Sequence, residues 1–303
     1  MNSVALRPRI GVPLALLLVT GVTYGLTYAL AGVAVRSGIP FLAYVFWLGV
    51  GAGVTMFVLS LLFRRPPRVT LAHLKCYAVT GTSGFAIPYA IVAVVVGHGV
   101  PSGIMSMVIA LAPMMTYLGA VVFRLERAWW LRFLGLVIGI AGIVLIVAPE
   151  SSLPSRDLVP WILLALIVPF GYATTTIAAI IMRPPAMDSL SFGAGFFLAP
   201  LPILFVAMLL ADEFWVFGGS FGGAEWALVL SGFVQALGIY LFLELVRLMG
   251  PVFFTTVNFI TPLTGILFGM AFFGERLSFW VLIALVPLFL GLIFVILPRG
   301  EPK

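Results

Sequence analysis

Hydrophobic residues run along this chain in ten long stretches, each close to twenty residues, separated by short polar breaks. The breaks hold residues that do not continue an apolar helix, such as the segment from Arg64 to Arg68 and the segment from Gly218 to Ser220. A helix needs about 20 apolar residues to cross a bilayer core of about 30 Å. The pattern therefore predicts ten membrane-spanning helices: Ile10–Val35, Pro40–Phe63, Thr70–Val96, Pro101–Phe123, Ala128–Ala148, Leu158–Met182, Asp188–Ala211, Ala224–Arg247, Pro251–Phe273 and Phe279–Leu297.

Composition supports lipid as the solvent of this chain. Of its 303 residues, 63% are hydrophobic and 9% are charged, against roughly a quarter charged in a soluble domain. The net charge of +6 does not indicate a nucleic-acid partner, because the basic residues lie in the gaps between apolar runs. The first run is too long for the apolar region of a signal peptide, about 7–15 residues, and is read as a spanning helix.

Lysine and arginine fix the expected orientation. With the N-terminus inside, thirteen lie on the inner side: Arg7, Arg9, Arg64, Arg65, Arg68, Lys75, Arg124, Arg127, Arg132, Arg183, Arg247, Arg299 and Lys303. Only Arg36, Arg156 and Arg276 lie outside. The positive-inside rule then predicts two cytoplasmic termini in a multi-pass protein of the bacterial cytoplasmic (inner) membrane.

An internal repeat divides the chain. The segment from Pro113 to Gly142 recurs 149 residues later as the segment from Pro262 to Gly291, and Glu126-Arg127 recurs as Glu275-Arg276. We expect a five-helix repeat over 1–148, a linker over 149–156 and a second repeat over 157–303. Because five is odd, the second repeat enters the membrane from the other side. The predicted fold is all-α, a 5+5 inverted repeat around a central cavity.

The repeated segments also resemble a known family. Val100-Pro-Ser-Gly, Pro113, Leu125-Glu-Arg and Gly142, with Gly250-Pro-Val-Phe, Pro262, Gly274-Glu-Arg-Leu-Ser and Gly291, are similar to the EamA repeats of the drug/metabolite transporter superfamily. The resemblance covers essentially the whole chain and is nearest in style to exporters of aromatic amino acids. It implies a basket in which helices one to four and six to nine surround a cavity, with five and ten peripheral. It leaves the substrate open.

Polar side chains at mid-membrane depth are candidates for a binding site. They should face inward because a polar group in hydrocarbon needs a partner. The alternative for Ser and Thr is a bond to their own helix backbone; Gln235 and Asn258 have more bonding capacity than that. Together with aromatic residues at similar depth, the predicted substrate-binding set is Tyr24, Tyr28, Trp47, Thr82, Ser83, Tyr89, Tyr172, Gln235, Tyr240, Asn258 and Thr261.

Four further residues are candidates for gating or hinge motion. His98 lies in the turn Gly97-His-Gly99, and Pro113 and Pro262 lie inside spans where each removes a backbone hydrogen bond. Glu244 is the carboxylate clearly inside a span, close enough to Arg247 to form a structural pair. Each also has an ordinary reading, as a solvated turn residue, a packing kink or an ion pair. Without a mid-membrane acid, facilitated transport or exchange is favoured over carboxylate-driven proton coupling.

Glycine pairs spaced four apart predict close helix contacts first and association between copies second: Gly21–Gly25, Gly49–Gly53, Gly135–Gly139 and Gly265–Gly269. We therefore expect a monomer or a weak homo-oligomer. No metal-ligand spacing, nucleotide loop or catalytic triad is present in the sequence, so we expect neither an enzyme nor a cofactor.

The leading hypothesis is a secondary transporter that works by alternating access, with a small-molecule substrate and the lipid bilayer as its partners. Its expected cargo is amino acids, above all aromatic or hydrophobic ones, or similar zwitterionic metabolites moved outward. One alternative is efflux of lipophilic cations, for which tyrosine faces and Glu244 are suitable. The other is a membrane scaffold or receptor that transports nothing.

Overall fold

The structure, a computed structural model, describes residues 11–185, 187–218, 221–249 and 251–297. These residues hold ten helical segments long and apolar enough to cross a membrane, which confirms the predicted number of spans. Ile10 and the basic residues Arg7, Arg9, Arg299 and Lys303 lie outside the described residues.

Five of the ten spans are continuous helices. They are α1 (Gly11–Arg36), α2 (Phe41–Leu62), α7 (Trp130–Val147), α12 (Gly223–Met249) and α15 (Phe279–Ile296). The other five are broken. The third span is α3 (Leu71–Gly81), the π-helix η1 (Thr82–Ala86) and α4 (Ile87–Gly97), and the fourth is α5 (Ser102–Ile109) and α6 (Ala112–Val122). The sixth is a 3-10 turn η2 (Arg156–Leu158), α8 (Val159–Ala165) and α9 (Ile167–Met182). The seventh is α10 (Ser189–Leu198) and α11 (Leu201–Leu210), and the ninth is α13 (Pro251–Thr255) and α14 (Val257–Phe273).

Proline accounts for most of the breaks, because it lacks an N–H and clashes with the preceding turn. Pro88 follows η1, Pro113 lies at the start of α6, and Pro169 lies early in α9. The two repeat-related prolines differ, however. The fourth span breaks just before Pro113, whereas Pro262 lies inside an unbroken α14 and the ninth span breaks earlier, at Thr256.

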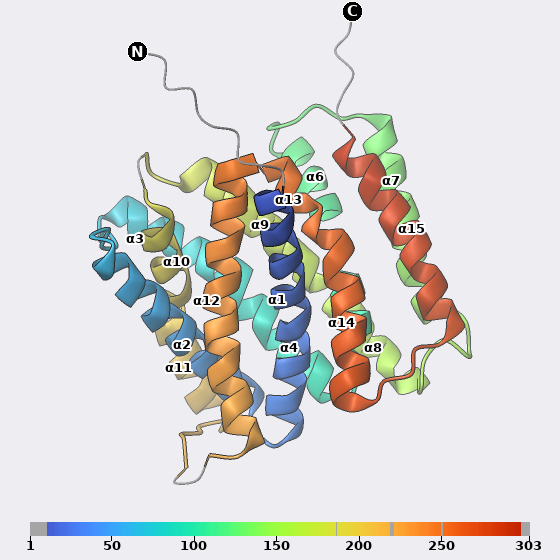
Figure 1. Cartoon of the computed structure of the whole chain (residues 1–303), viewed down its shortest axis with the longest axis horizontal. Helices are drawn as coiled ribbons and strands as arrows, with labels where there is room; N and C mark the ends of the chain where they lie inside the picture. Colours follow the sequence, from blue (N-terminus) through green and yellow to red (C-terminus); the bar gives the residue numbers. More distant parts are fainter. Residues whose placement is uncertain (1–10, 186, 219–220, 250, 298–303) are drawn as a thin grey trace, which may run out of the picture.

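Two faces of the molecule can be defined from the ends of the helices. The terminal face is the one at which α1 begins and α15 ends, and the distal face is the one at which α1 ends and α12 begins (Figure 1). The first span of the first half runs from the terminal to the distal face, and the sixth span runs back the other way (Figure 1). The two halves therefore have opposite orientation, as an inverted repeat requires.

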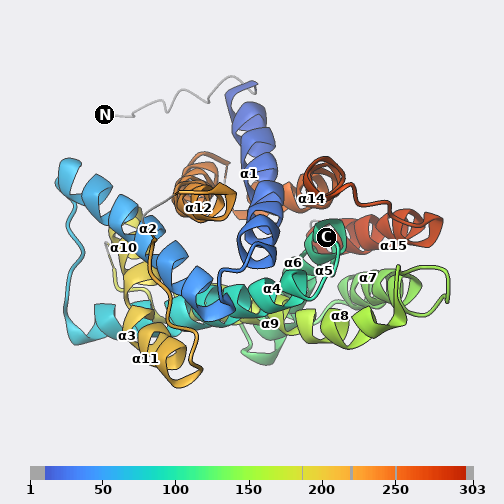
Figure 2. The same ribbon diagram turned by 90° about the horizontal axis from the view of Figure 1, so that it is seen from below.

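The fifth and tenth spans, α7 and α15, pack against each other at one edge of the bundle (Figure 2). The backbones touch at two glycines, Gly135 of α7 and Gly291 of α15. A β-carbon on Gly135 would lie 2.6 Å from the Gly291 carbonyl oxygen, and one on Gly291 would lie 2.5 Å from the Gly135 carbonyl oxygen. In the same way Gly21 and Gly25 lie against Ile260 and Thr264 of α14. These glycine pairs make close contacts within the chain.

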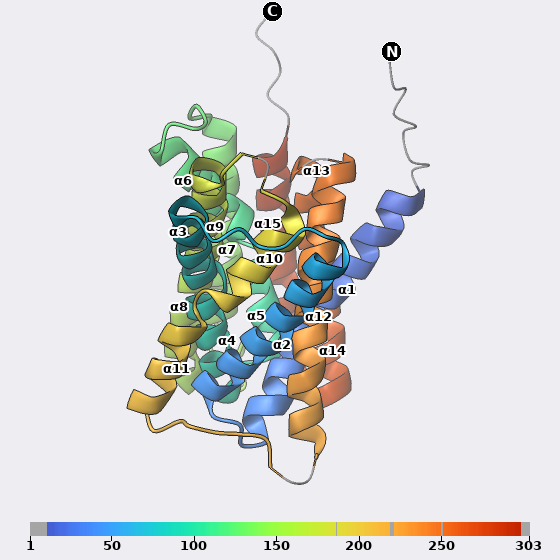
Figure 3. The ribbon, with the colours of Figure 1, turned by 90° about the vertical axis from the view of Figure 1, so that its left-hand side faces the viewer.

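The hydrophobic core is divided near the terminal face. One large cluster of buried side chains runs through both halves. A second, separate cluster consists of Leu17, Leu245 and Val257, at the terminal ends of α1, α12 and α14. At the terminal face the beginning of α1 lies on the opposite side of the molecule from α3 and α9 (Figure 3). Toward the distal face α1 comes into contact with α4.

Candidate functional site

Four tyrosines from three spans lie together in the middle of the bundle. Tyr172 of α9 lies close to Tyr24 and Tyr28 of α1 and to Tyr89 of α4. We call these four residues the tyrosine cluster. All four belong to the predicted binding set, so the structure brings together residues up to 148 positions apart (24 to 172).

Local sequence features explain how these rings meet. Tyr24 and Tyr28 are one turn apart on α1, so they share a face. A glycine on the opposing α12 makes room for the first ring, since a β-carbon on Gly238 would lie 2.8 Å from the Tyr24 ring. The Tyr24 hydroxyl donates to the Gly238 carbonyl at 3.4 Å.

A second glycine allows α9 to approach the third span. A β-carbon on Gly171 would lie 2.6 Å from the Ser83 carbonyl oxygen and 2.8 Å from the Pro88 ring. Gly171 precedes Tyr172 in the chain, and Pro88 precedes Tyr89. The break at η1 and the glycine facing it therefore set the Tyr89–Tyr172 contact.

Gln235 of α12 carries an acceptor that the protein does not use. Its side chain is 4% exposed, and its Oε1 has no hydrogen-bond partner. Leaving a buried polar atom unpaired is costly, so this oxygen is suited to accept a hydrogen bond from a bound molecule. The residue lies one helical turn from Gly238, which contacts Tyr24.

The other predicted polar residues of the spans find partners in the protein. The Asn258 amide donates to the Thr255 carbonyl at 3.0 Å, and the buried Thr261 hydroxyl donates to the Val257 carbonyl at 3.1 Å. The Ser83 hydroxyl lies 2.8 Å from that of Thr175 and joins η1 to α9. Thr82 is half-buried at the start of η1. Ser83, Asn258 and Thr261 thus each form a hydrogen bond within the protein.

Two predicted aromatic residues lie elsewhere. Trp47 donates from Nε1 to the Trp215 carbonyl at 2.9 Å and packs edge-on against Phe217, 5.2 Å between ring centroids. It lines an apolar groove between α2 and α12. Tyr240 is 44% exposed and follows the outward stripe of Leu230, Phe233 and Leu237 along α12. Trp47 and Tyr240 thus lie apart from the tyrosine cluster, because depth alone does not say which way a helix residue faces.

The gating candidates have different surroundings. His98 stacks on Trp161 of α8 at 3.7 Å and lies 5.7 Å from the ring of Phe41 of α2, between ring centroids. His98 therefore connects α2 and α8 at the distal face. The ordinary reading, a turn histidine that contacts only solvent, does not account for these two ring contacts. Glu244 lies half-buried on α12, and the side chain of its expected partner Arg247 lies outside the described residues.

Sequence reasoning missed two charged residues at the distal face. Arg36, at the end of α1, donates to the carbonyls of Val96 (2.9 Å) and Val100 (3.2 Å), and its guanidinium lies 4.4 Å from the centre of the Phe273 ring. Glu275 accepts from the backbone N–H of Ser102 at 2.9 Å and of Gly103 at 3.5 Å. The signal in the sequence was the repeat of Glu275, but its partner lies 173 residues away.

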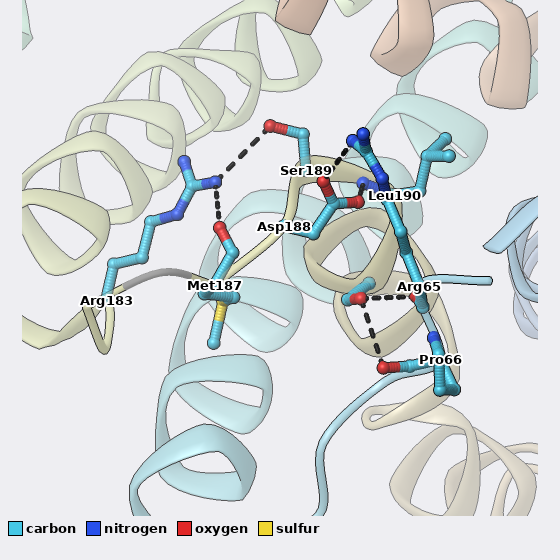
Figure 4. A network of polar contacts seen from close by, with 8 residues as sticks. Arg65, Pro66, Arg183, Met187, Asp188, Ser189 and Leu190 are labelled. Atoms are coloured by element: carbon cyan, nitrogen blue, oxygen red, sulfur yellow. Dashed lines mark hydrogen bonds and ion pairs between the residues drawn. The ribbon is translucent and has the colours of Figure 1, made fainter. Parts of the chain in front are cut away.

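The terminal face carries a basic network of its own. Arg65 pairs with Asp188 at 2.7 Å, and Asp188 in turn accepts from the Leu190 N–H at 2.9 Å, which caps α10 (Figure 4). Arg183 donates to the Met187 carbonyl at 2.8 Å (Figure 4). The Ser191 hydroxyl donates to the Arg65 carbonyl at 2.7 Å. These contacts tie the loop after α2 to the start of α10.

Ten apolar spans in two inverted halves, with buried uncharged polar groups at the centre, define the class of membrane transport proteins. Comparison with known proteins makes this specific. Residues 11–148 and 159–297 each match the EamA-like transporter family, and the chain belongs to that family. The earlier resemblance is thus confirmed.

The chain is also similar to the "Uncharacterized inner membrane transporter YedA" of Escherichia coli strain K12, at 29% identity over 262 residues, covering 85% of this chain and 81% of the relative. The same protein of strain O157:H7 gives the same values. One solved structure, described only as the crystal structure of a protein, matches with a TM-score of 0.63 at 19% identity, over 94% of this chain and 96% of that one. This last likeness supports the fold alone. Among the described residues, no group of three or more His, Cys, Asp or Glu side chains is arranged to hold a metal ion.

Proposed function

We propose that this protein is a secondary transporter that moves small zwitterionic metabolites, above all aromatic or hydrophobic amino acids, out of the cytoplasm by alternating access. The single observation that carries this proposal is the unpaired, buried Oε1 of Gln235 close to the tyrosine cluster. An ammonium group supplies N–H donors for that oxygen. Tyrosine rings supply faces for a cation or an aromatic ring.

The same groups argue against a strong anion as cargo. Neither Gln235 nor any member of the tyrosine cluster carries a fixed positive charge. A zwitterion has no net charge and needs no fixed counter-charge. Tyrosine hydroxyl groups can donate to its carboxylate, and its ammonium group can donate to Oε1 of Gln235. A quaternary ammonium cation would use the ring faces but would have no N–H donor for Gln235. The zwitterion therefore fits both parts of the site.

Orientation and direction follow from charge. The basic residues of the described terminal face, such as Arg65, Arg132 and Arg183, are the ones that the positive-inside rule assigns to the cytoplasm. With that assignment the terminal face, where the core is divided, is the side from which the tyrosine cluster would be loaded. An exporter passes through such a cytoplasm-facing state when it binds its cargo.

Flux into proteoliposomes tests the proposal. We expect uptake of labelled phenylalanine or tryptophan, acceleration by unlabelled substrate inside, and no dependence on a pH gradient. Gln235→Leu is expected to lower the flux roughly tenfold, as the loss of one hydrogen bond to a charged group predicts, and Tyr172→Phe to lower it less. Tyr240→Phe is the matched control, because that ring lies on the outward stripe, and it should leave the flux unchanged.

Several outcomes would contradict this reading. Absence of flux for every amino acid tested would remove the substrate class. Flux of quaternary ammonium compounds that is unaffected by Gln235→Leu would favour cation efflux instead. Absence of any flux together with spans inaccessible from both faces would favour the scaffold.

A further inference from the structure

The two glutamates of the internal repeat lie in turns that share one backbone hydrogen bond, at opposite faces. The Glu126 N–H donates to the Ala120 carbonyl at 3.1 Å, and the Glu275 N–H donates to the Gly269 carbonyl at 3.3 Å. Ala120 and Gly269 are themselves 149 residues apart, as are the two glutamates. The turns differ in their left-handed residue, which is Arg124 in one and Gly274 in the other, and in the contacts of the glutamate side chains.

At the distal face the Glu275 carboxylate reaches across to another span. It accepts from the Ser102 N–H at 2.9 Å and from the Gly103 N–H at 3.5 Å, at the start of α5. The unpaired amides at a helix start and the helix dipole both favour a carboxylate there. Arg36 lies near enough to Glu275 to interact with it electrostatically. We call the contact of Glu275 with Ser102 and Gly103 the distal latch.

The helices under the distal latch are in close contact. A β-carbon on Gly269 would lie 2.6 Å from the Ser102 hydroxyl oxygen, and one on Gly265 would lie 2.6 Å from Cβ of Ser106. The Ser106 side chain is completely buried, and its hydroxyl lies 3.4 Å from the Pro262 carbonyl oxygen. The distal halves of the fourth and ninth spans are thus closed on each other.

At the terminal face the equivalent glutamate makes no such contact. Glu126 pairs with Arg132 of the neighbouring α7, and its side chain is 48% exposed. The repeat-related helices α6 and α13 do not pack to a comparable extent within the described residues, whereas α5 and α14 do. Likewise α1 packs against α4, but its counterpart α9 has no comparable packing with α12 in the described part of the chain. The helix pairs that pack together at the distal face therefore have counterparts that are separated at the terminal face.

We propose that Glu275 and Glu126 are alternating latches of the transport cycle. Glu275 holds the distal face shut in the state described here. When that face opens, Glu126 leaves Arg132 and binds the Val252 N–H at the start of the ninth span, the counterpart of the Gly103 N–H 149 residues earlier, which closes the terminal face. Pro251 stands where the first half has Ser102 and has no N–H to donate, so this latch is the weaker of the two. This inference rests on alternating access as part of the proposed function, but not on the identity of the cargo.

The two latches should have opposite effects on the equilibrium. A carboxylate that accepts backbone N–H bonds makes a charge-assisted contact, whereas a solvent-exposed ion pair such as Glu126–Arg132 contributes little. Removing the charge of Glu275 therefore destabilises the state with the closed distal face. Removing the charge of Glu126 mainly destabilises the state with the closed terminal face.

Alkylation of a single cysteine at position 106 reports on the distal face. The native Cys76 is first replaced by alanine, and Ser106→Cys is introduced under the distal latch; a membrane-impermeant maleimide is then added from the distal side of proteoliposomes. The assay needs no substrate, so its failure is distinct from failure of the flux test. We expect Glu275→Gln to raise the alkylation rate roughly tenfold. Glu126→Gln should not raise it, and the double variant should return to within about threefold of the parent.

Glu213→Gln is the matched control. Glu213 also binds a backbone amide at the distal face, that of Leu42 at 2.6 Å, but it lies in the loop after α11 and outside the repeated turns. It should leave the alkylation rate within about twofold of the parent. Glu275→Asp, which keeps the charge but shortens the reach, covers the case in which Glu275→Gln does not fold. Unchanged alkylation in a folded Glu275 variant, an equal rise in Glu213→Gln, or a rise in Glu126→Gln would each overturn the proposal.

Discussion

The two ends of this molecule are built from related sequences yet are organised differently. At the distal face Arg36, His98 and Glu275 connect spans from both halves through backbone carbonyls, aromatic rings and helix-start amides. At the terminal face Glu126 pairs with Arg132 of its own half, and the contacts of Arg65 join the halves at an exposed edge, between the loop after α2 and the start of α10. The difference shows that a duplicated turn can make different contacts, depending on which span its side chain reaches.

The largest effect on this comparison is expected from Gly269→Ala. The new methyl group would collide with the Glu275 carboxylate and lie 2.6 Å from the Ser102 hydroxyl oxygen, so both the distal latch and the close helix contact are lost. We expect a cost of about 2 kcal/mol to the closed distal face. The measurement is alkylation of Ser106→Cys, expected to rise by about thirtyfold.

Ala120, the repeat counterpart of Gly269, supplies the control for this substitution. Ala120→Gly makes the terminal turn resemble the distal one, but that face is parted, so alkylation at position 106 should not rise. If Gly269→Ala left alkylation unchanged, the distal contact would not limit access from that side.

A smaller effect is expected from Arg36→Lys. Lysine keeps the charge but lacks the planar fork that binds the carbonyls of Val96 and Val100 together. We expect a loss of about 1 kcal/mol in stability, measured as a lower midpoint of thermal unfolding in detergent. Arg132→Lys at the terminal face serves as the comparison, and it should shift the midpoint less. An equal shift for both would show that the distal contacts are not the stronger ones.

The smallest effect is expected from Arg65→Ala. The Arg65 side chain is 61% exposed, and exposed ion pairs contribute about 0–1 kcal/mol. The unfolding midpoint should stay within error of the parent. Asp188→Ala should cost more, about 1 kcal/mol, because Asp188 also caps α10 through the Leu190 N–H. A large drop in the unfolding midpoint for Arg65→Ala would mean that polar contacts stabilise the terminal face as much as the distal face.

Much of the fold could be predicted from the chain alone. Runs of apolar residues between breaks such as Arg64 to Arg68 placed the ten spans to within a few residues. The internal repeat predicted two related halves. What it did not predict was that Pro113 breaks its span directly while Pro262 lies inside an unbroken helix. The packing of each proline against its neighbours decides this.

The site was harder to predict, because depth in the membrane does not fix the direction of a side chain. The members of the tyrosine cluster entered the predicted binding set because they shared a depth, and their role in binding stays a prediction. Trp47 and Tyr240 had the same depth and face elsewhere. Arg36 and Glu275 were missed as functional residues because their partners lie 60 and 173 residues away. No local pattern contains such pairs.

The seam between α7 and α15 has a consequence for how such a chain arises. Gly135 packs against Gly291, and their repeat counterparts Ala284 and Gly142 pack against each other, since a β-carbon on Gly142 would lie 3.0 Å from the Ala284 carbonyl oxygen. The contact is therefore self-complementary in the way that a two-fold symmetric interface between identical subunits must be. A half-length ancestor with this one helix surface would already possess the means to pair with a second copy inserted upside down. Fusion into one polypeptide then freed the two copies to diverge, and the residues 124 to 127 and 273 to 276 record how differently each has since been used.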